Sequence, residues 1–124
     1  MCNKLHSDSK PIKASGVGYK LFTKGSRGSL CPMARDTDYE YAPDGWIVWD
    51  FFIDRCLIKD HGFCFLLSLK EARRLLRHWT ASTCVIHKIQ YEEGLGKHKE
   101  NRITSQGSYV TALCRRFRIM EEVK

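Results

Sequence analysis

The chain has 124 residues, of which 43% are hydrophobic and 28% are charged, and its net charge is +7. This composition fits one compact domain with a hydrophobic core and excludes wholesale disorder. The longest apolar runs, 46–49 and 63–67, are far shorter than the roughly 18 residues that a membrane span needs. Residues 1–7 lack the apolar core of a signal peptide. We therefore expect a cytoplasmic protein that has no membrane partner.

The charge is distributed unevenly along the chain. Residues 1–30 carry six Lys and Arg against a single acidic residue, whereas residues 31–62 carry three against seven carboxylates. Residues 63–124 carry twelve Lys and Arg against six Glu. Such segregation predicts a one-sided electrostatic field, which attracts polyanions or an acidic partner.

The N-terminal part of the chain divides into an arm and a strand. Residues 1–15 are polar and basic without a hydrophobic period, so they predict a flexible arm. Residues 16–23 predict the first strand of the domain, and residues 24–29 a turn. A short strand over 30–33 is confined to a sheet edge because it contains Pro32.

The middle of the chain is acidic and then strongly apolar. Residues 35–45 are rich in turn formers, and Pro43-Asp44-Gly45 is a turn signal. Residues 46–52 predict a strand, whereas 54–62 fit either a loop or another short strand. The apolar run 62–66 predicts a strand that leads directly into a helix.

A capped amphipathic helix is the clearest element. Ser68 and Glu71 have the spacing of a capping box. One side of the helix is apolar: Leu69, Ala72, Leu75, Leu76 and Trp79. The opposite side is basic: Lys70, Arg73, Arg74 and Arg77. This basic side fits either an ordinary solvated helix face or a surface for phosphates or acidic protein.

The C-terminal third predicts two strands, over 84–91 and 109–120, joined by a long polar loop over 92–106. With the earlier elements they give a single α+β domain over 16–124. Its mainly antiparallel sheet would carry one principal amphipathic helix on one face.

The six cysteines are not expected to form disulfides or a metal site, since reduced thiols are the default without a secretory signal. The nearest zinc pattern combines His61 and Cys64 with Cys84 and His87. Cys84 and His87 lie three apart in a predicted strand and so point to opposite faces. We expect no metal, and the cysteines act mostly as small hydrophobes.

No catalytic constellation is apparent, so an enzyme is the less favoured class. Cys64 with His61 and Cys84 with His87 are near pairs without a known motif context. Glu92-Glu93 at a strand end resembles an ADP-ribosyltransferase-like site, but the matching Arg and Ser-Thr-Ser signature is missing. Gly16-x-Gly18 opens a strand and is too short for a dinucleotide fingerprint. We expect no catalytic residues and no cofactor.

Binding through cations is the favoured hypothesis. Arginine prevails over lysine on the helix and in the last strand, and its planar fork suits phosphate and carboxylate alike. Alternatively, the last cluster protects a sheet edge and the loop cluster is a solvated tip. The candidate partner-binding residues are Lys70, Arg73, Arg74, Arg77, Lys97, Lys99, Arg102, Arg115, Arg116 and Arg118.

Several short motifs resemble a group of small phage and prophage accessory proteins. They are Gly18-Tyr19-Lys20-x-Phe22, Gly45-Trp46, Gly62-Phe63-x-Phe65 before Lys70-Glu71-Ala72-Arg73, and a closing Arg118-Ile119-Met120. The group usually has a histidine where this chain has Cys64. The resemblance implies an anti-defence or anti-CRISPR-like inhibitor in the host cytoplasm, which binds a host protein or nucleoprotein complex. A DNA- or RNA-binding module and a small ADP-ribosyltransferase-like enzyme are the alternatives.

Overall fold

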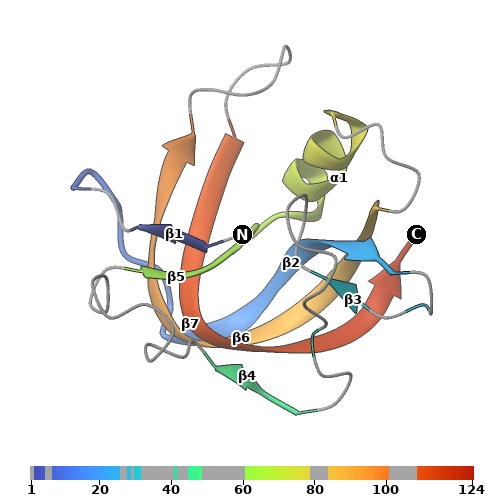
Figure 1. Cartoon of the computed structure of the whole chain (residues 1–124). Coiled ribbons are helices and arrows are strands. Elements are labelled where there is room, and N and C mark those ends of the chain that lie inside the picture. Colours follow the sequence, from blue (N-terminus) through green and yellow to red (C-terminus); the bar gives the residue numbers. More distant parts are fainter. Residues whose placement is uncertain are drawn as a thin grey trace.

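The computed structural model describes residues 2–4, 7–25, 28, 30–31, 41, 45–48, 61–78, 84–100 and 109–124. They form one antiparallel sheet and one helix (Figure 1). This confirms the predicted α+β domain with a helix packed on the sheet. The elements in chain order are β1 (Cys2–Lys4), β2 (Ser15–Lys24), β3 (Leu30–Cys31), β4 (Ile47–Val48), β5 (His61–Phe65), α1 (Leu69–His78), β6 (Cys84–Glu100) and β7 (Tyr109–Val123).

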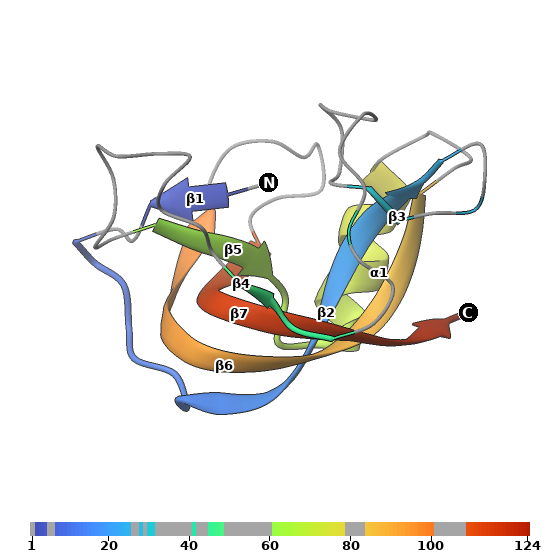
Figure 2. The ribbon, with the colours of Figure 1, turned by 60° about the horizontal axis from the view of Figure 1, so that its bottom comes forward.

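Two long, bent strands organise the sheet. The strands follow the order β1-β5-β7-β6-β2-β3, and β4 also pairs with β7. One edge of β7 therefore runs along β6, while the other edge meets β5 and then β4 (Figure 2). Figure 1 shows β6 and β7 sweeping together through a U. Register shifts between His87 and Ile89 and between Gly94 and Gly96 accompany this bend, as β-bulges do.

The sheet returns onto itself where β2 meets the end of β5. Tyr19 and Leu66 exchange two backbone hydrogen bonds of 2.7 Å, although β2 and β5 are not neighbours in the strand order. Gly18 permits this approach, because a Cβ atom there would lie 2.5 Å from Cδ2 of Phe65. We call this contact the β2–β5 seam.

The concave side of the sheet holds an aromatic core. Phe22, Phe65 and Phe117 are almost fully buried. The Phe63 ring lies 4.9 Å from that of Phe117, and the Phe65 ring lies 4.6 Å from that of Tyr91. The first pair is edge-to-face and the second is tilted, and aromatic contacts of this kind add to the stabilisation that burial alone gives. We call this cluster the inner core.

The helix packs on a second core on the opposite face of β2 and β6. Ala72 is fully buried against Leu21 and Ile86, and Leu75 and Leu76 pack beside them. The predicted apolar face is therefore confirmed, except that Trp79 lies outside the described residues. Among the residues described, no helix has the length and apolar character that a bilayer span requires.

The predicted helix cap is present in part. Ser68 Oγ accepts a hydrogen bond of 3.4 Å from the Glu71 amide, as an N-cap does. The Glu71 carboxylate does not complete a capping box; it pairs with Arg74 instead, at 3.1 Å. A cation one turn away competes successfully for this exposed carboxylate.

One predicted loop is overturned by the structure, and the residues of the expected arm include a short strand. The prediction of a polar loop over 92–106 is wrong for residues 92–100. In the structure β6 continues to Glu100, which pairs with Tyr109 of β7. Cross-strand pairing outweighs the polar composition here. Within the expected flexible arm, β1 pairs with β5, and Lys10 and Lys97 exchange two backbone hydrogen bonds of 2.8 Å. Of the strand expected over 46–52, the described part is β4, which pairs with β7.

Candidate functional site

The basic side of the helix is exposed but partly engaged. Lys70, Arg73 and Arg77 are exposed, while the side chain of Arg74 keeps 30% of its surface accessible. Arg73 Nη2 donates a 3.1 Å hydrogen bond to the main-chain oxygen of Lys124. The helix therefore presents a cationic face, although Arg73 and Arg74 already have polar partners.

A second cationic group surrounds Trp46. The guanidinium carbons of Arg116 and Arg118 lie 4.8 Å and 5.6 Å from the centroid of the Trp46 ring. Both distances are within the range of a cation–π interaction. The pairing of Ile47 with Phe117 explains this grouping. Both of these side chains point into the inner core, so their sequence neighbours Trp46, Arg116 and Arg118 lie on the opposite, outer face of the sheet. We call Trp46, Arg116 and Arg118 the Trp46 patch.

Cross-strand partners fix the two arginines. Arg116 Nε lies 3.1 Å from Glu92 Oε1 in an ion pair that lacks hydrogen-bond geometry, and Arg118 Nη2 donates a 2.7 Å hydrogen bond to Gln90 Oε1. Each partner stands opposite its arginine in the β6–β7 register. The guanidinium groups are therefore held in place before any partner arrives.

Apolar side chains border the Trp46 patch. Val48 pairs with Arg116 and is 53% exposed, while Val17 pairs with Gln90 and is 45% exposed. The helix does not cover this part of the outer face, since its buried side packs on Leu21, Leu66 and Ile86. The outer face thus combines an aromatic ring, two arginines and exposed aliphatic groups.

The remaining predicted residues lie elsewhere. Lys97 and Lys99 are on β6, toward its far end, where Lys97 bonds to Lys10. Arg115 is half-buried, and its Nε atom is shielded from solvent. Arg102 lies outside the described residues. Of the predicted cations that the structure describes, Arg116 and Arg118 are grouped around an aromatic ring, and the others lie on separate surfaces.

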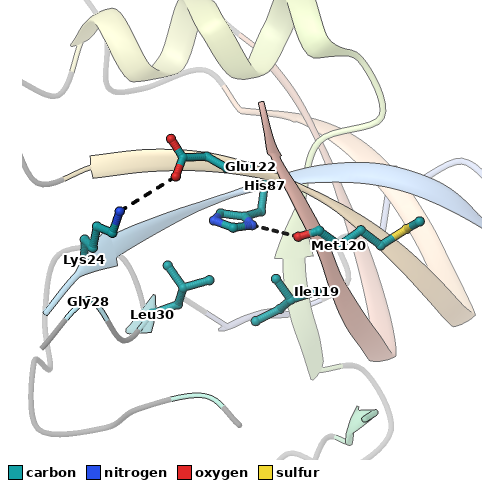
Figure 3. A pocket seen from close by; sticks show the side chains of 7 residues that line it. All are labelled: Lys24, Gly28, Leu30, His87, Ile119, Met120 and Glu122. Atoms are coloured by element: carbon teal, nitrogen blue, oxygen red, sulfur yellow. Dashed lines mark hydrogen bonds and ion pairs between the residues drawn. The ribbon is translucent and has the colours of Figure 1, made fainter. Parts of the chain in front are cut away.

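A pocket of about 330 Å³ opens beside the C-terminal part of β7 (Figure 3). His87 Nδ1 lies 2.8 Å from the carbonyl oxygen of Met120, and Lys24 Nζ lies 3.8 Å from Glu122 Oε1. The residues that line it come from β2, β3, β6, β7 and the turn after β2: Lys24, Gly28, Leu30, His87, Ile119, Met120 and Glu122.

The other chemical groups weighed from the sequence are separated. Cys84 packs in the helix-side core, whereas the His87 ring contacts Phe22 of the inner core, so the two side chains lie on opposite faces of β6. In the described ranges, no three His, Cys, Asp or Glu side chains come close enough to hold a metal ion. Glu92 is engaged by Arg116. Burial raises the pKa of the Cys114 thiol to about 12, which disfavours the nucleophilic thiolate.

Comparisons with protein-family models, with curated proteins and with solved structures find no match.

Sequence reasoning missed both the Trp46 ring between the arginines and the pocket. The alternation of Arg116 and Arg118 in a strand indicates a shared face, but only the register of β4 on β7 brings Trp46 to it. The pocket depends on β3 folding back on β2 and on the register shift beside His87. The spacing of residues in the sequence does not indicate any of these strand pairings.

Proposed function

We propose that this protein binds a host nucleoprotein complex through its outer basic surface, as an accessory protein of a phage or mobile element. The observation that carries the proposal is the Trp46 patch, where two arginines flank an aromatic ring on a part of the sheet face that α1 does not cover. The resemblance of the short sequence motifs to phage accessory proteins supports the biological setting.

Tryptophan and arginine dominate the energetics of many macromolecular interfaces. In the Trp46 patch, Glu92 and Gln90 already restrain the two arginines. Binding therefore costs less side-chain entropy than it would with free arginines.

Within the described residues, the two arginines also keep donors for a partner. A guanidinium has five N–H donors. Arg118 uses Nη2 to donate to Gln90, whereas the contact of Arg116 with Glu92 is an ion pair without hydrogen-bond geometry. The remaining donors suit phosphate oxygens. The exposed helix cations Lys70 and Arg77 contribute a longer-range field, which raises the rate of association more than the affinity.

The test compares two double variants that remove the same charge. Arg116→Gln with Arg118→Gln alters the Trp46 patch, and Lys70→Gln with Arg77→Gln is the matched helix control. We expect the patch variant to lose at least about tenfold in affinity for the captured complex, and the control to lose only a few-fold. Thermal unfolding of each variant checks that the domain stays folded.

Nuclease treatment and salt titration identify the partner's chemistry. A host complex that contains nucleic acid, and whose capture depends on the patch arginines, supports the proposal. Binding to purified DNA or RNA with a steep dependence on salt, and without any host protein, would favour a plain nucleic-acid-binding module. Equal losses in the two double variants would show that net charge alone acts, and would refute the role of the Trp46 patch.

A further inference from the structure

The pocket beside His87 has the features of a small-ligand site that is separate from the Trp46 patch. Its lining mixes aliphatic side chains with one histidine, one lysine and one carboxylate. Its volume of about 330 Å³ is at the lower end for ligand pockets. Such a pocket suits a compact ligand.

The His87 ring presents a hydrogen-bond acceptor. The carbonyl oxygen of Met120 can only accept, so the 2.8 Å contact requires the proton to be on Nδ1. In the neutral ring, Nε2 then carries a lone pair. Figure 3 shows the ring beside Leu30 and Ile119, within the pocket lining.

Lys24 and Glu122 form a loose pair at the pocket. Their 3.8 Å separation is too long for a hydrogen bond, and their side chains are 48% and 30% exposed. An exposed pair of this kind contributes little to stability. Both groups can therefore turn to a ligand at small cost, with the ammonium as donor and the carboxylate as double acceptor.

The apolar lining favours a flat ring. Leu30 and Ile119 provide aliphatic surface on one side of the His87 ring, whereas Met120 contributes its carbonyl oxygen and its side chain runs away from the pocket (Figure 3). A planar heterocycle with a polar edge can pack its faces on the aliphatic groups while its edge forms hydrogen bonds with Lys24 and Glu122.

We propose that this pocket binds a guanine base. Guanine places the O6 acceptor beside the N1–H and N2–H donors on one edge. Glu122 accepts the two N–H groups, Lys24 donates to O6, and a sugar hydroxyl donates to His87 Nε2. Adenine, cytosine and uracil each lack two adjacent N–H donors for one carboxylate.

Guanine can come from a free nucleotide or from a nucleic-acid strand, and two probes separate these sources. One is guanosine 5′-monophosphate, and the other is a short oligothymidine that contains a single guanine. Tighter binding of the mononucleotide assigns the pocket to free nucleotides, and tighter binding of the oligonucleotide assigns it to a base within a strand.

Titration calorimetry of the full chain with nucleosides provides the test. We expect guanosine to bind with a Kd on the order of 0.1 mM, as a ligand of this size permits. Inosine, which lacks the N2 amino group, should bind about tenfold more weakly. Adenosine, cytidine and uridine should bind more weakly still.

The neighbouring residue supplies a matched control. Glu122→Gln removes the carboxylate at the pocket, whereas Glu121→Gln removes one that pairs at 3.9 Å with Lys88. We expect at least a tenfold loss of guanosine affinity for the first variant and less than a twofold loss for the second. Absence of guanosine binding by the wild type, equal binding of guanosine and inosine, or equal losses in the two variants would overturn the proposal.

The guanine site does not depend on the Trp46 patch. The Arg116→Gln, Arg118→Gln variant should bind guanosine like the wild type, and Glu122→Gln should still capture the host complex. The two proposals can therefore fail independently.

Discussion

Lys20 Nζ donates a 2.6 Å hydrogen bond to the carbonyl oxygen of Cys64, which joins β2 to β5 beside the seam. Lys20 is only 4% exposed, and its ammonium lies 5.6 Å from the centroid of the Phe117 ring. In the described part of the chain it forms no ion pair with a carboxylate. The charge of a buried lysine is costly to desolvate, whereas its apolar stem packs favourably in the core. The stem and the charge therefore have opposite effects on the stability of the fold.

The first prediction separates these two contributions. Lys20→Met keeps a long apolar side chain in the inner core and removes the charge, so we expect unfolding free energy within about 1 kcal/mol of the wild type. Lys20→Ala leaves a cavity and should cost about 2–4 kcal/mol. Urea denaturation measures both values. If Lys20→Met destabilises as much as Lys20→Ala, the hydrogen bond and not the stem is what matters.

The second prediction concerns alkaline pH. Burial raises the pKa of the Cys114 thiol from 9.0 to about 12. Between these values the unfolded thiol is ionised and the folded thiol is not, so the folded state binds more protons. This contribution to stability is complete below pH 9 and is lost as the pH rises toward 12, by up to about 1.4 kcal/mol per unit.

Urea denaturation at pH 8.5, 9.5 and 10 measures this slope. Cys114→Ala should be less stable at pH 8.5 because of the cavity, and should lose stability with pH less steeply than the wild type. Tyr91, whose pKa is also raised by burial and then by Cys114, adds to the slope mainly above its ordinary value of 10.0. Parallel slopes for the two proteins would mean that Cys114 ionises as readily in the folded state as in the unfolded one.

Local patterns predicted the elements better than their extents. The Ser68 cap and the apolar positions from Leu69 to Leu76 indicate the helix because they are local features. The polar composition of 92–100 indicates a loop, yet β7 supplies these residues with a complete pairing partner. Strand pairing depends on residues that are far away in the sequence, and a pattern read from neighbouring residues does not contain them.

The candidate sites show the same limit. The alternation of Arg116 and Arg118 along β7 predicts a shared face, and the structure agrees. Trp46 joins them only because β4 pairs with β7 in one particular register. The pocket beside His87 forms because β3 folds back on β2 and places Leu30 in its lining. Such long-range placement requires the three-dimensional arrangement.

The third prediction tests the orientation of α1. Leu76 packs in the helix-side core, whereas Arg77 is exposed. Leu76→Ala should lower the unfolding free energy by about 2 kcal/mol, because it removes apolar contacts from a half-buried position. Arg77→Ala should change it by less than about 0.5 kcal/mol. Comparable losses in thermal or urea unfolding would show that the two sides of the helix are assigned incorrectly.

The fourth prediction concerns the segment before β2. Ile12 packs against the inner core, and the Gly94 amide donates a 3.0 Å hydrogen bond to the carbonyl oxygen of Ala14. A protease must accommodate an extended, unbonded chain, so these contacts should protect the bond after Lys13 from trypsin in the native state. Ile12→Ser removes the apolar anchor and should accelerate this cleavage about tenfold or more, while the urea midpoint moves much less. Mass spectrometry of the early fragments gives the two rates. Rapid cleavage after Lys13 in both proteins would instead support the flexible arm that the composition of residues 1–15 predicts.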